Sequence, residues 1–500
     1  MTIKPFLLLT CCLLIIAFSE AQIKNGIYHE PYRPQVHFSP KEKWMNDPNG
    51  MVYYEGVYHL FFQYYPKDIV WGPMHWGHAV SKDLMHWKQL PIALYPDSLG
   101  YIFSGSAVVD YQNTSGFGKN GKVPMIAIFT NHDPKLEKTG SDKFQNESLA
   151  YSLDDGNTWT KYPGNPVLKN PGIKDFRDPK VSWYAPGKKW LMTLATKDRI
   201  TFYSSPDLKN WTKESEFGAI IGAHGGVWEC PDLFPLKHNG KTYWILLVSI
   251  NPGGTNGGSA TQYFIGGFNG KTFTPFSTTT KWIDYGPDDY AGVTWGNTGD
   301  RKIFLGWMSN WLYANQVPTK TWRNAMTIPR ELAIEQIGDD VFLTSNPVKE
   351  LGYIALKPLE VNPAGAKLPI QYEFSFNTGN IMDYTIILSN KSGEHIDIGY
   401  SVQDNAYFID RSHSGIVDFS PDFLRPLKAA RITASPASNI KLVADAASVE
   451  LFADDGLTNM TAIFFPKGRF THLHIKNKKG MIIKNLKIAP LISIWQGKSQ

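Results

Sequence analysis

A short pattern recurs three times in the first half of the chain and constrains the fold more than any other feature. It consists of a serine, an aspartate two residues later, turn-forming residues and a tryptophan, at residues 81–87, 152–159 and 205–211. Each copy follows a strand-like run, and such hairpins at intervals of roughly 50 to 70 residues are typical of a β-propeller, with one small sheet per blade. Two further hairpins, at 243–275 and 290–310, bring the predicted number to about five blades. The alternative is a set of unrelated hairpins that share turn residues.

The rest of the first half supports this interpretation. From about residue 30 to 335, short apolar or aromatic runs alternate with turn clusters, without a sustained helical period. Examples of these runs are residues 51–54, 57–63, 125–130, 190–195, 243–250 and 302–308. The chain also contains 16 Trp, 24 Tyr, 43 Gly and 33 Pro, a composition that fits an all-β protein of short strands and turns.

The second half has a different texture. Between about 352 and 495, tryptophan almost vanishes, and alternating strand-like segments occur at 371–376, 384–388, 395–400, 448–452, 461–465 and 470–475. Their spacing is that of a β-sandwich. We therefore predict an all-β fold with a five-bladed β-propeller at 30–335, a transition at 330–350, and a C-terminal β-sandwich at 350–495.

The N-terminus predicts export. Residues 1–21 have Lys4 near the start, an apolar run over 6–18, and a small-residue cleavage site that ends at Ala21. The run is too short to span a membrane, and a lipoprotein reading that uses Cys11 is less favoured because the residue before it is Thr10. After cleavage only Cys230 remains, so the exported chain, periplasmic or extracellular, cannot form an internal disulfide.

Charge argues against a nucleic-acid partner. The formal net charge is +5, but lysines and arginines are scattered and form no long basic run, whereas a nucleic-acid footprint would cluster them. We interpret the excess as an ordinary solvated surface.

Residues 44–50, Trp-Met-Asn-Asp-Pro-Asn-Gly, are dense in turn-forming residues. They predict a tight reversal between two extended, aromatic-rich segments. Because Pro48 restricts the residue before it, we expect Asp47 to be extended, with its carboxylate held in one direction and unprotonated. Such a carboxylate suits a nucleophile. The alternative is that Asp47 only forms the turn.

Glu229 is a candidate general acid. It lies between Trp228 and Cys230, and its nearest basic residues in the sequence are His224 and Lys237. Burial against apolar neighbours is therefore expected to raise the pKa of Glu229, so that it holds a proton near neutrality. The alternative is a charge at the rim of the fold.

Asp178 completes a set of three carboxylates. It follows Arg177 and precedes Pro179, and we expect Arg177 to keep it ionised. An ionised carboxylate suits the acceptance of hydrogen bonds from sugar hydroxyls; the alternative is a structural ion pair. Three carboxylates framed by Trp, Phe or Pro are what cleavage of a bond between sugars requires.

Other site patterns are weaker. Residues 116–121 match the GxGxxG spacing of dinucleotide sites, but a strand-like segment follows where a helix should begin. His75 and His78 have a metal-ligand spacing without an accompanying cysteine or acidic cluster, so polar lining of a cleft is the preferred interpretation. The GxSxG motif of serine hydrolases does not occur. We therefore expect neither a metal nor an organic cofactor.

Taken as a set, these motifs resemble the invertase, levanase and inulinase family of glycoside hydrolases, family 32, over nearly the whole mature chain. The specific matches are residues 44–50, Phe-Arg-Asp-Pro at 176–179 and Glu-Cys-Pro-Asp-Leu at 229–233. Supporting matches lie at 61–66, 71–78, 103–106, 322–332 and 449–456. One departure is Tyr65, where many members carry Asn, which leaves the catalytic set unaffected.

The resemblance implies a fold and a set of roles. The fold is a five-bladed propeller with a funnel-shaped active site on its axis, followed by a β-sandwich. Asp47 would be the nucleophile, Glu229 the acid/base, and Asp178 the residue that binds fructosyl hydroxyls. The fructose subsite would be lined by Asn46, Gln63, Trp71, Phe103, Ser104, Arg177 and Trp311.

The activity that follows is retaining hydrolysis of terminal β-D-fructofuranosyl residues from a fructan, levan or inulin, or from sucrose. In a retaining enzyme the two catalytic carboxyl groups should lie about 5 to 5.5 Å apart. Exo-action is favoured over endo-action because the matched residues describe a pocket for a terminal fructose. A non-catalytic fructan-binding relative is the alternative from another class, and the presence of all three carboxylates argues against it.

Overall fold

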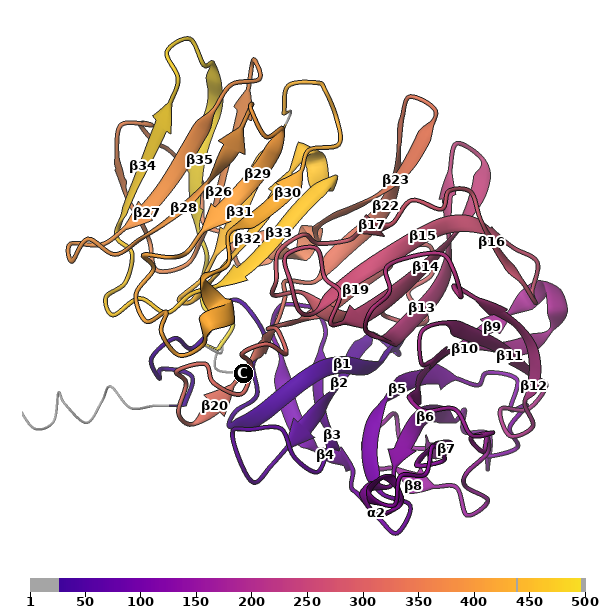
Figure 1. The fold of residues 1–500 in the computed structure, drawn as a ribbon. Helices are drawn as coiled ribbons and strands as arrows, with labels where there is room; N and C mark the ends of the chain where they lie inside the picture. The colour runs from indigo at the N-terminus through magenta and orange to yellow at the C-terminus, as the bar shows by residue number, and fades with distance from the viewer. Residues whose placement is uncertain (1–26, 438, 496–500) are drawn as a thin grey trace, which may run out of the picture.

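The computed structural model describes residues 27–437 and 439–495 and consists mainly of strands. Figure 1 shows two bodies, one of sheets arranged around a common centre and one of two facing sheets in orange and yellow. No helix in these ranges is long and apolar enough to cross a membrane. The predicted signal peptide, residues 1–21, lies outside the described residues.

Five sheets form the first body. The first contains β1 (Lys43–Tyr54), β2 (Val57–Tyr65), β3 (His75–Ser81), β4 (Lys88–Leu94) and β20 (Trp322–Arg323). The second contains β5 (Tyr101–Val109), β6 (Met125–His132), β7 (Gln145–Ser152) and β8 (Thr160–Lys161). The third contains β9 (Phe176–Tyr184), β10 (Lys189–Thr196), β11 (Ile200–Ser205) and β12 (Thr212–Phe217).

The fourth sheet contains β13 (Val227–His238), β14 (Lys241–Asn251), β15 (Ala260–Phe268), β16 (Phe273–Pro275) and β17 (Lys281–Trp282). The fifth contains β18 (Tyr290–Thr294), β19 (Lys302–Met308), β21 (Ala325–Met326), β22 (Arg330–Ile337) and β23 (Asp340–Pro347). The helical segments are short: α2 (Pro134–Lys138), η1 (Ala185–Gly187), η2 (Lys349–Tyr353), η3 (Pro421–Leu424) and η4 (Asp454–Gly456).

The innermost strands close the first body into a ring. β1, β5, β9, β13 and β18, each the first strand of its sheet, contact one another in turn, and β18 returns to β1. The architecture is therefore the predicted five-bladed β-propeller (Figure 1). The proposed boundary at residue 335 stays a prediction, and the fifth sheet itself continues to the end of β23.

The repeated pattern forms the same turn in the first three blades, between the third and fourth strands. In each copy the serine hydroxyl donates to the aspartate two residues later, at 2.7 to 3.1 Å. The tryptophan indole N–H donates to the carbonyl three residues earlier, at 2.9 to 3.0 Å, as Trp87 does to Leu84. The prediction of equivalent hairpins is confirmed, because each copy satisfies its own polar groups within the turn.

The prediction of a tight reversal at residues 44–50 is wrong. This stretch lies inside β1, which pairs with β2 on both sides of it and is interrupted by two bulges. The chain reverses instead at Glu55 and Gly56, both of which have positive φ. Bulges let a strand carry Asn, Asp and Pro without ending, since a bulge leaves one residue out of the ladder.

The second body is the predicted β-sandwich of two sheets with six strands each. One contains β24 (Leu359–Glu360), β26 (Tyr372–Thr378), β31 (Ile440–Ala444), β32 (Ser448–Ala453), β33 (Thr458–Ile463) and β35 (Ile483–Pro490). The other contains β25 (Ala366–Lys367), β27 (Tyr384–Ser389), β28 (His395–Ser401), β29 (Ala406–Asp410), β30 (Leu427–Ala430) and β34 (His472–Asn477). Alternate residues of β27 are buried, and the core includes Phe374, Ile386 and Leu442.

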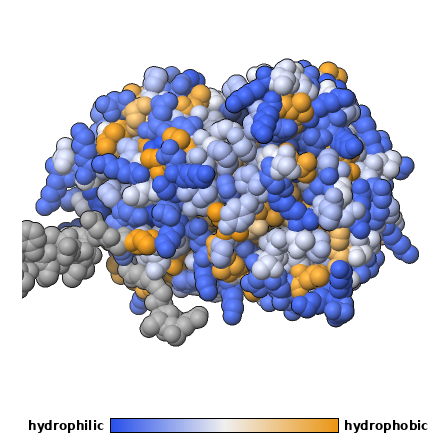
Figure 2. All heavy atoms as spheres, turned by 90° about the horizontal axis from the view of Figure 1, so that it is seen from below, coloured by the Kyte–Doolittle hydropathy of each residue, from blue (hydrophilic) through white to orange (hydrophobic). Residues whose placement is uncertain are grey.

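Hydrophobic residues at the surface are dispersed. On the face drawn in Figure 2 they form small areas separated by hydrophilic residues. Such scattered exposure is normal for a folded protein and needs no further explanation.

Buried charges join the propeller to the sandwich. Arg330 of β22 has no exposed surface, and its Nη1 donates to Asp284 at 2.8 Å and to Asp289 at 3.0 Å, both on the propeller. Its Nε donates to Glu450 of β32 at 3.0 Å, and its Nη2 donates to Glu450 and to Thr461 of β33. One guanidinium therefore connects carboxylates of both bodies.

His37 lies beside this cluster, between two carboxylates of the sandwich. Its Nδ1 is 2.8 Å from Asp445 and its Nε2 is 2.8 Å from Glu450. Burial alone would lower the pKa of His37, but the hydrogen bonds and charges of both carboxylates outweigh it and raise the pKa to about 9. His37 is therefore an imidazolium at neutral pH.

This histidine is expected to make stability depend on alkaline pH. Because its folded-state pKa is above the unfolded value, its contribution is complete below pH 6.5 and is lost as pH rises through about 9. Thermal unfolding midpoints of the native protein should fall across this window, and those of His37→Gln should fall less. His86→Gln, a change at a partly exposed histidine, is the control. Parallel curves for all three proteins would contradict the assignment.

Candidate active site

Equivalent bulges shape one end of the inner ring. In every inner strand two residues face a single residue of the next strand, which is the definition of a β-bulge. The pairs and the residues they face are Asn46-Asp47 with Gln63, Phe103-Ser104 with Thr130, Asp178-Pro179 with Leu194, Cys230-Pro231 with Val248, and Ala291-Gly292 with Gly306. Bulges re-aim side chains, so this level of the ring gathers polar groups from all five blades.

Asp47 is held by donors from two blades. Asn46 Nδ2 donates to its Oδ1 at 2.9 Å, and Ser104 Oγ donates to its Oδ2 at 2.7 Å. Trp44 Nε1 in turn donates to Asn46 Oδ1 at 2.8 Å. Burial, and then the charge of Glu229, raise the pKa of Asp47, while the two hydrogen bonds oppose the shift. The expected fixed orientation is present.

Glu229 has a close cationic neighbour that is not one of its neighbours in the sequence. Arg177 Nη2 donates to Glu229 Oε1 at 2.8 Å, and its Nε donates to the same oxygen at 3.2 Å. The hydroxyl of Tyr290 donates to Oε2. Arg177 is distant in the sequence, but its strand β9 is next to β13 in the ring. Sequence neighbours could not reveal this contact.

Asp178 is less ionised than its neighbour Arg177 had suggested. Burial raises its pKa to about 7; Arg177 opposes this shift, and the charges of Glu229 and Asp47 add to it. Arg177 Nε is 3.9 Å from Asp178 Oδ2, which is too far for a hydrogen bond. The guanidinium donates its N–H groups to Glu229 and Asp175 instead. The expected dominance of Arg177 is therefore wrong. The Cys230 backbone N–H donates to Asp178 Oδ2 at 3.1 Å.

Cys230 joins two of the carboxylates, a role that the sequence analysis missed. Its Sγ lies 3.6 Å from Asp47 Oδ2 and 3.6 Å from Asp178 Oδ2. Burial and the three surrounding carboxylates raise the pKa of the thiol well above its ordinary value. The available signal was that this cysteine adjoins Glu229 and precedes a proline.

This buried thiol is expected to resist alkylation. Iodoacetamide reacts with thiolates, so treatment at neutral pH should leave both activity and the number of titratable thiols unchanged in the folded protein. Mass spectrometry after unfolding in guanidinium should then show the modified Cys230. Rapid modification of the folded protein would contradict the environment described above.

The predicted binding residues lie at the bulges or contact aromatic residues next to them. Gln63 is buried, and its Nε2 has no hydrogen-bond partner among the described residues. Phe103 stacks on His132 with ring centroids 4.3 Å apart and meets the exposed Trp71 edge-on at 6.2 Å. Trp311 stacks beside Trp44 at 5.9 Å. With Asn46, Ser104 and Arg177, every sequence-predicted residue is accounted for near the bulges or in the aromatic groups beside them.

A chain of two buried hydrogen bonds, called the relay here, links the backbone of Asp178 to Thr130 and Glu147. Its backbone N–H donates to Thr130 Oγ1 at 3.0 Å, and that hydroxyl donates to Glu147 Oε2 at 2.8 Å. Burial raises the pKa of Glu147 well above its ordinary value. Asp178 has a φ of 65°, an uncommon value for this residue type, which the relay helps to hold. Nothing in the local sequence around residue 147 indicated this role.

The histidine prediction needs one correction. His78 is buried, with Nε2 3.1 Å from His59 Nδ1, rather than lining a cleft. Burial lowers its pKa well below the ordinary value. Within 27–437 and 439–495 there is no group of three or more His, Cys, Asp or Glu side chains that could hold a metal ion.

Comparisons with known proteins agree with this architecture. The model described as "Glycosyl hydrolases family 32 N-terminal domain" matches residues 37–347, and "Glycosyl hydrolases family 32 C terminal" matches 343–495. A levanase of Bacillus subtilis (strain 168) is 45% identical over 507 residues, which cover 97% of this chain and 74% of the relative. An extracellular exo-inulinase of Aspergillus awamori is 39% identical, covering 91% and 93%.

Solved structures show the same relationship. The crystal structure of exo-inulinase from Aspergillus awamori is similar with a TM-score of 0.86 and 37% identity, covering 94% of this chain and 100% of that chain. A β-fructofuranosidase from Schwanniomyces occidentalis, complexed with fructosyl-erythritol, has a TM-score of 0.83 and 31% identity, covering 94% and 99%. Since the family models span the propeller and the sandwich and the relatives align over nearly the whole chain, the chain belongs to glycosyl hydrolase family 32.

Proposed function

We propose that this chain is a retaining glycoside hydrolase that releases terminal β-D-fructofuranosyl residues from levan or inulin, and from sucrose. The observation that carries the proposal is that Asp47, Asp178 and Glu229 lie at or directly beside the equivalent bulges of three inner strands of one ring, β1, β9 and β13. The relatives support the substrate class, since they are named as a levanase and an exo-inulinase. A buried set of three carboxylates also suits sugar cleavage better than mere binding.

In the first step Asp47 attacks the anomeric carbon of a fructosyl unit. Glu229 protonates the leaving oxygen, the glycosidic bond breaks, and the fructosyl group becomes an ester of Asp47. The donors Asn46 and Ser104 favour the ionised, attacking form of Asp47. In the second step Glu229 takes a proton from water, whose oxygen attacks the same carbon and releases fructose with retained configuration.

Tyr290 can serve Glu229 in both of its states. Its hydroxyl donates to Oε2 of the ionised Glu229. When Glu229 is protonated, the hydroxyl oxygen of Tyr290 can instead accept a hydrogen bond from the acid. Arg177 holds the other oxygen, Oε1, at 2.8 Å. Hydrogen bonds to both oxygens therefore orient the Glu229 carboxyl group. We propose that Oε2 carries the proton that Glu229 donates to the leaving oxygen and later takes from water.

Asp178 is the proposed acceptor for fructosyl hydroxyls. Its Oδ2 is engaged by the backbone N–H and thiol of Cys230, and its position beside Asp47 suits the sugar ring that Asp47 attacks. Gln63, Trp71, Phe103 and Trp311 are the proposed lining of the fructose pocket; a pocket that encloses a terminal sugar favours exo-action.

The carboxyl separation is a further prediction of the retaining mechanism. The groups of Asp47 and Glu229 should lie about 5 to 5.5 Å apart, whereas an inverting enzyme needs about 6.5 to 9.5 Å to admit a water. Coulombic coupling between the two groups supports proximity. NMR of the first-formed fructose anomer is the matching solution measurement, and inversion would exclude the double displacement.

A product profile tests the function directly. The mature protein is incubated separately with levan, inulin and sucrose, and Asp47→Asn is run in parallel. Fructose as the only early product of a polymer is expected, and the preferred polymer identifies the linkage. A ladder of oligosaccharides would instead mean an endo-enzyme with an open cleft. No release from any substrate would overturn the proposal.

Export is part of the proposal. The predicted signal peptide at residues 1–21 and the extracellular Aspergillus relatives favour secretion. N-terminal sequencing of the protein recovered outside the cytoplasm should begin after Ala21. We also retain the division into a propeller at 30–335 and a sandwich at 350–495, which limited proteolysis would test.

A further inference from the structure

A second cavity lies at the other end of the inner ring. It has a volume of about 700 Å³ and is lined from all five blades by residues in the inner strands or directly after them, among them Val52, Val109, Trp183, Phe234 and Trp295. Each of these residues is five positions after a residue of the catalytic level: Asp47, Ser104, Asp178, Glu229 and Tyr290. At about 3.3 Å per residue these positions lie at most ~16 Å along the strands from the catalytic residues. Asp47, Asp178 and Glu229 are not among the residues that line this cavity, which is therefore distinct from the proposed active site.

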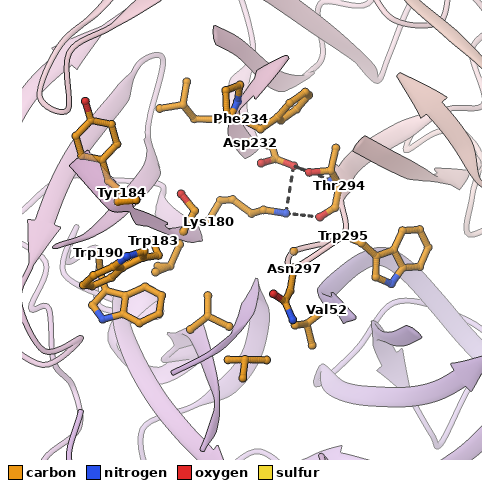
Figure 3. Close-up of a pocket in the computed structure, with 18 of the residues that line it drawn as sticks. Val52, Lys180, Trp183, Tyr184, Trp190, Asp232, Phe234, Thr294, Trp295 and Asn297 are labelled. Carbon is orange, nitrogen blue, oxygen red and sulfur yellow. Dashed lines mark hydrogen bonds and ion pairs between the residues drawn. The ribbon is translucent and has the colours of Figure 1, made fainter. Parts of the chain in front are cut away.

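Polar contacts separate the two levels. Lys180 Nζ lies 3.1 Å from Asp232 Oδ2, and the same oxygen accepts the N–H and the hydroxyl of Thr294, both at 2.7 Å. Figure 3 shows the Lys180 side chain extending across the cavity toward Asp232 and Thr294. The lysine and the aspartate neutralise each other, and this pairing disfavours an ionic ligand.

Two further charged side chains at the cavity, Asp110 and Lys302, also have hydrogen-bond partners within the protein. Asp110 accepts the backbone N–H groups of Thr114 at 3.0 Å and Ser115 at 2.8 Å. Lys302 Nζ donates to the carbonyl of Gly299 at 2.9 Å. Apart from the exposed Lys237, the charged side chains that line the cavity have partners within the protein, so the cavity suits a neutral ligand.

Aromatic side chains cover one wall. Trp183 and Trp190 meet edge-on, with ring centroids 5.0 Å apart and planes at 68°, and Tyr184 lies 6.1 Å from Trp244. Trp183, Tyr184 and Trp244 are only half-buried, so their rings offer surface to the cavity. Figure 3 shows Trp183, Tyr184 and Trp190 on one side and Asn297 on the other.

Uncharged polar groups occupy the rim. Asn297 Nδ2 donates to the Tyr53 carbonyl at 2.7 Å and to the Tyr111 hydroxyl at 2.8 Å. Ser182 and Thr242 are exposed cavity residues. Flat aromatic faces opposite neutral hydrogen-bonding groups are complementary to a sugar, which has apolar C–H faces and a hydroxyl edge. The volume is within the range of about 300 to 1,000 Å³ of ligand pockets.

We propose that this cavity is a second, non-catalytic sugar-binding site that takes a short fructan segment. The proposal rests on the proposed function for the identity of the sugar. It requires no chemistry at the cavity. A polymer held at this end of the propeller would stay near the enzyme while chain ends are consumed at the other end.

Binding stoichiometry tests the site in a protein that cannot turn over. Asp47→Asn is titrated with a fructosyl trisaccharide by calorimetry, alone and combined with Trp183→Ala. Two binding sites are expected in the first protein and one in the second. The matched control combines Asp47→Asn with Phe276→Ala, which removes an aromatic ring that is 55% exposed outside the cavity, and should retain both sites.

The outcomes separate this inference from the proposed function. A single site in Asp47→Asn, or two sites that Trp183→Ala leaves intact, would overturn the second site. Absence of fructose release by the unmodified protein, together with a Trp183-dependent site, would overturn only the catalytic proposal.

A second measurement covers the case in which Trp183→Ala does not fold. Crystals of Asp47→Asn soaked with the trisaccharide should show density between Trp183 and Asn297. Density confined to the catalytic level would contradict the inference.

Discussion

Replacing Asp47 with asparagine is expected to lower kcat on a fructan or on sucrose by on the order of 10⁴-fold or more, with the fold retained. The amide cannot form the fructosyl ester, but Asn46 and Ser104 can still bond to it. Fructose release measures the loss, and circular dichroism checks the fold. A variant that keeps a tenth of the parent kcat would remove Asp47 from the nucleophile role.

The same substitution is expected to raise the thermal unfolding midpoint at neutral pH. Burial raises the folded-state pKa of Asp47 above 3.8, so ionising this group costs folding free energy as pH rises through the folded pKa. The neutral asparagine removes that cost. Calorimetric scans of both proteins at neutral pH measure the difference, and a lower midpoint for Asp47→Asn would contradict the burial argument.

Asp207→Asn is the matched control for both effects. Burial would raise the pKa of Asp207, but hydrogen bonds from Asn210, Lys209 and Ser205 outweigh it and lower the pKa. This carboxylate therefore stabilises the fold above pH 3.8 and loses that contribution as pH falls. Asp207→Asn should keep full activity and unfold at a lower temperature, the reverse of Asp47→Asn.

Arg330→Met is expected to destabilise the protein by about 3 to 5 kcal/mol, the cost of removing one partner of a buried ion pair. The methionine leaves Asp284, Asp289 and Glu450 buried without their shared cation. Because these carboxylates come from the propeller and the sandwich, the two bodies should also unfold less cooperatively. Denaturant unfolding is followed by tryptophan fluorescence, which reports mainly the propeller, and gives the loss of stability. Calorimetric thermal scans show whether the two bodies unfold in one transition or in two.

Arg199→Met makes the same change at a more exposed ion pair. Arg199 is 37% exposed and pairs with Asp198 and Glu216, and surface pairs are worth about 0 to 1 kcal/mol. Its unfolding free energy should differ from the parent by no more than that. Equal losses in Arg199→Met and Arg330→Met would show that the buried cluster has no special part in joining the two bodies.

Features that depend on neighbours in the chain were predictable. The serine, aspartate and tryptophan of each repeated hairpin bond to one another within a few residues, as Ser81 does to Asp83, so the turn and the blade number were readable from the pattern. The sandwich strands were likewise readable from alternate burial. The three carboxylates stood out because apolar residues and prolines frame each of them.

The electrostatics of the site could not be predicted in the same way. Arg177 precedes Asp178 in the sequence but directs its guanidinium to Glu229, 52 positions away. The strongest raising influence on Asp178 is burial, which depends on the whole propeller rather than on the next residue. Tyr290 and Glu147 join the site from blades that no local pattern connects to it.

Interactions between near neighbours specify the all-β architecture and the repeated blades, because strand propensity, turns and their short-range bonds act within a few residues of the chain. Packing between distant parts of the chain makes residues 44–50 bulge within β1 instead of turning. The same long-range packing brings Arg177 to Glu229 and places the Cys230 thiol between Asp47 and Asp178. Closure of the ring sets those contacts, since it brings together strands that are separated by dozens of residues and removes their side chains from water.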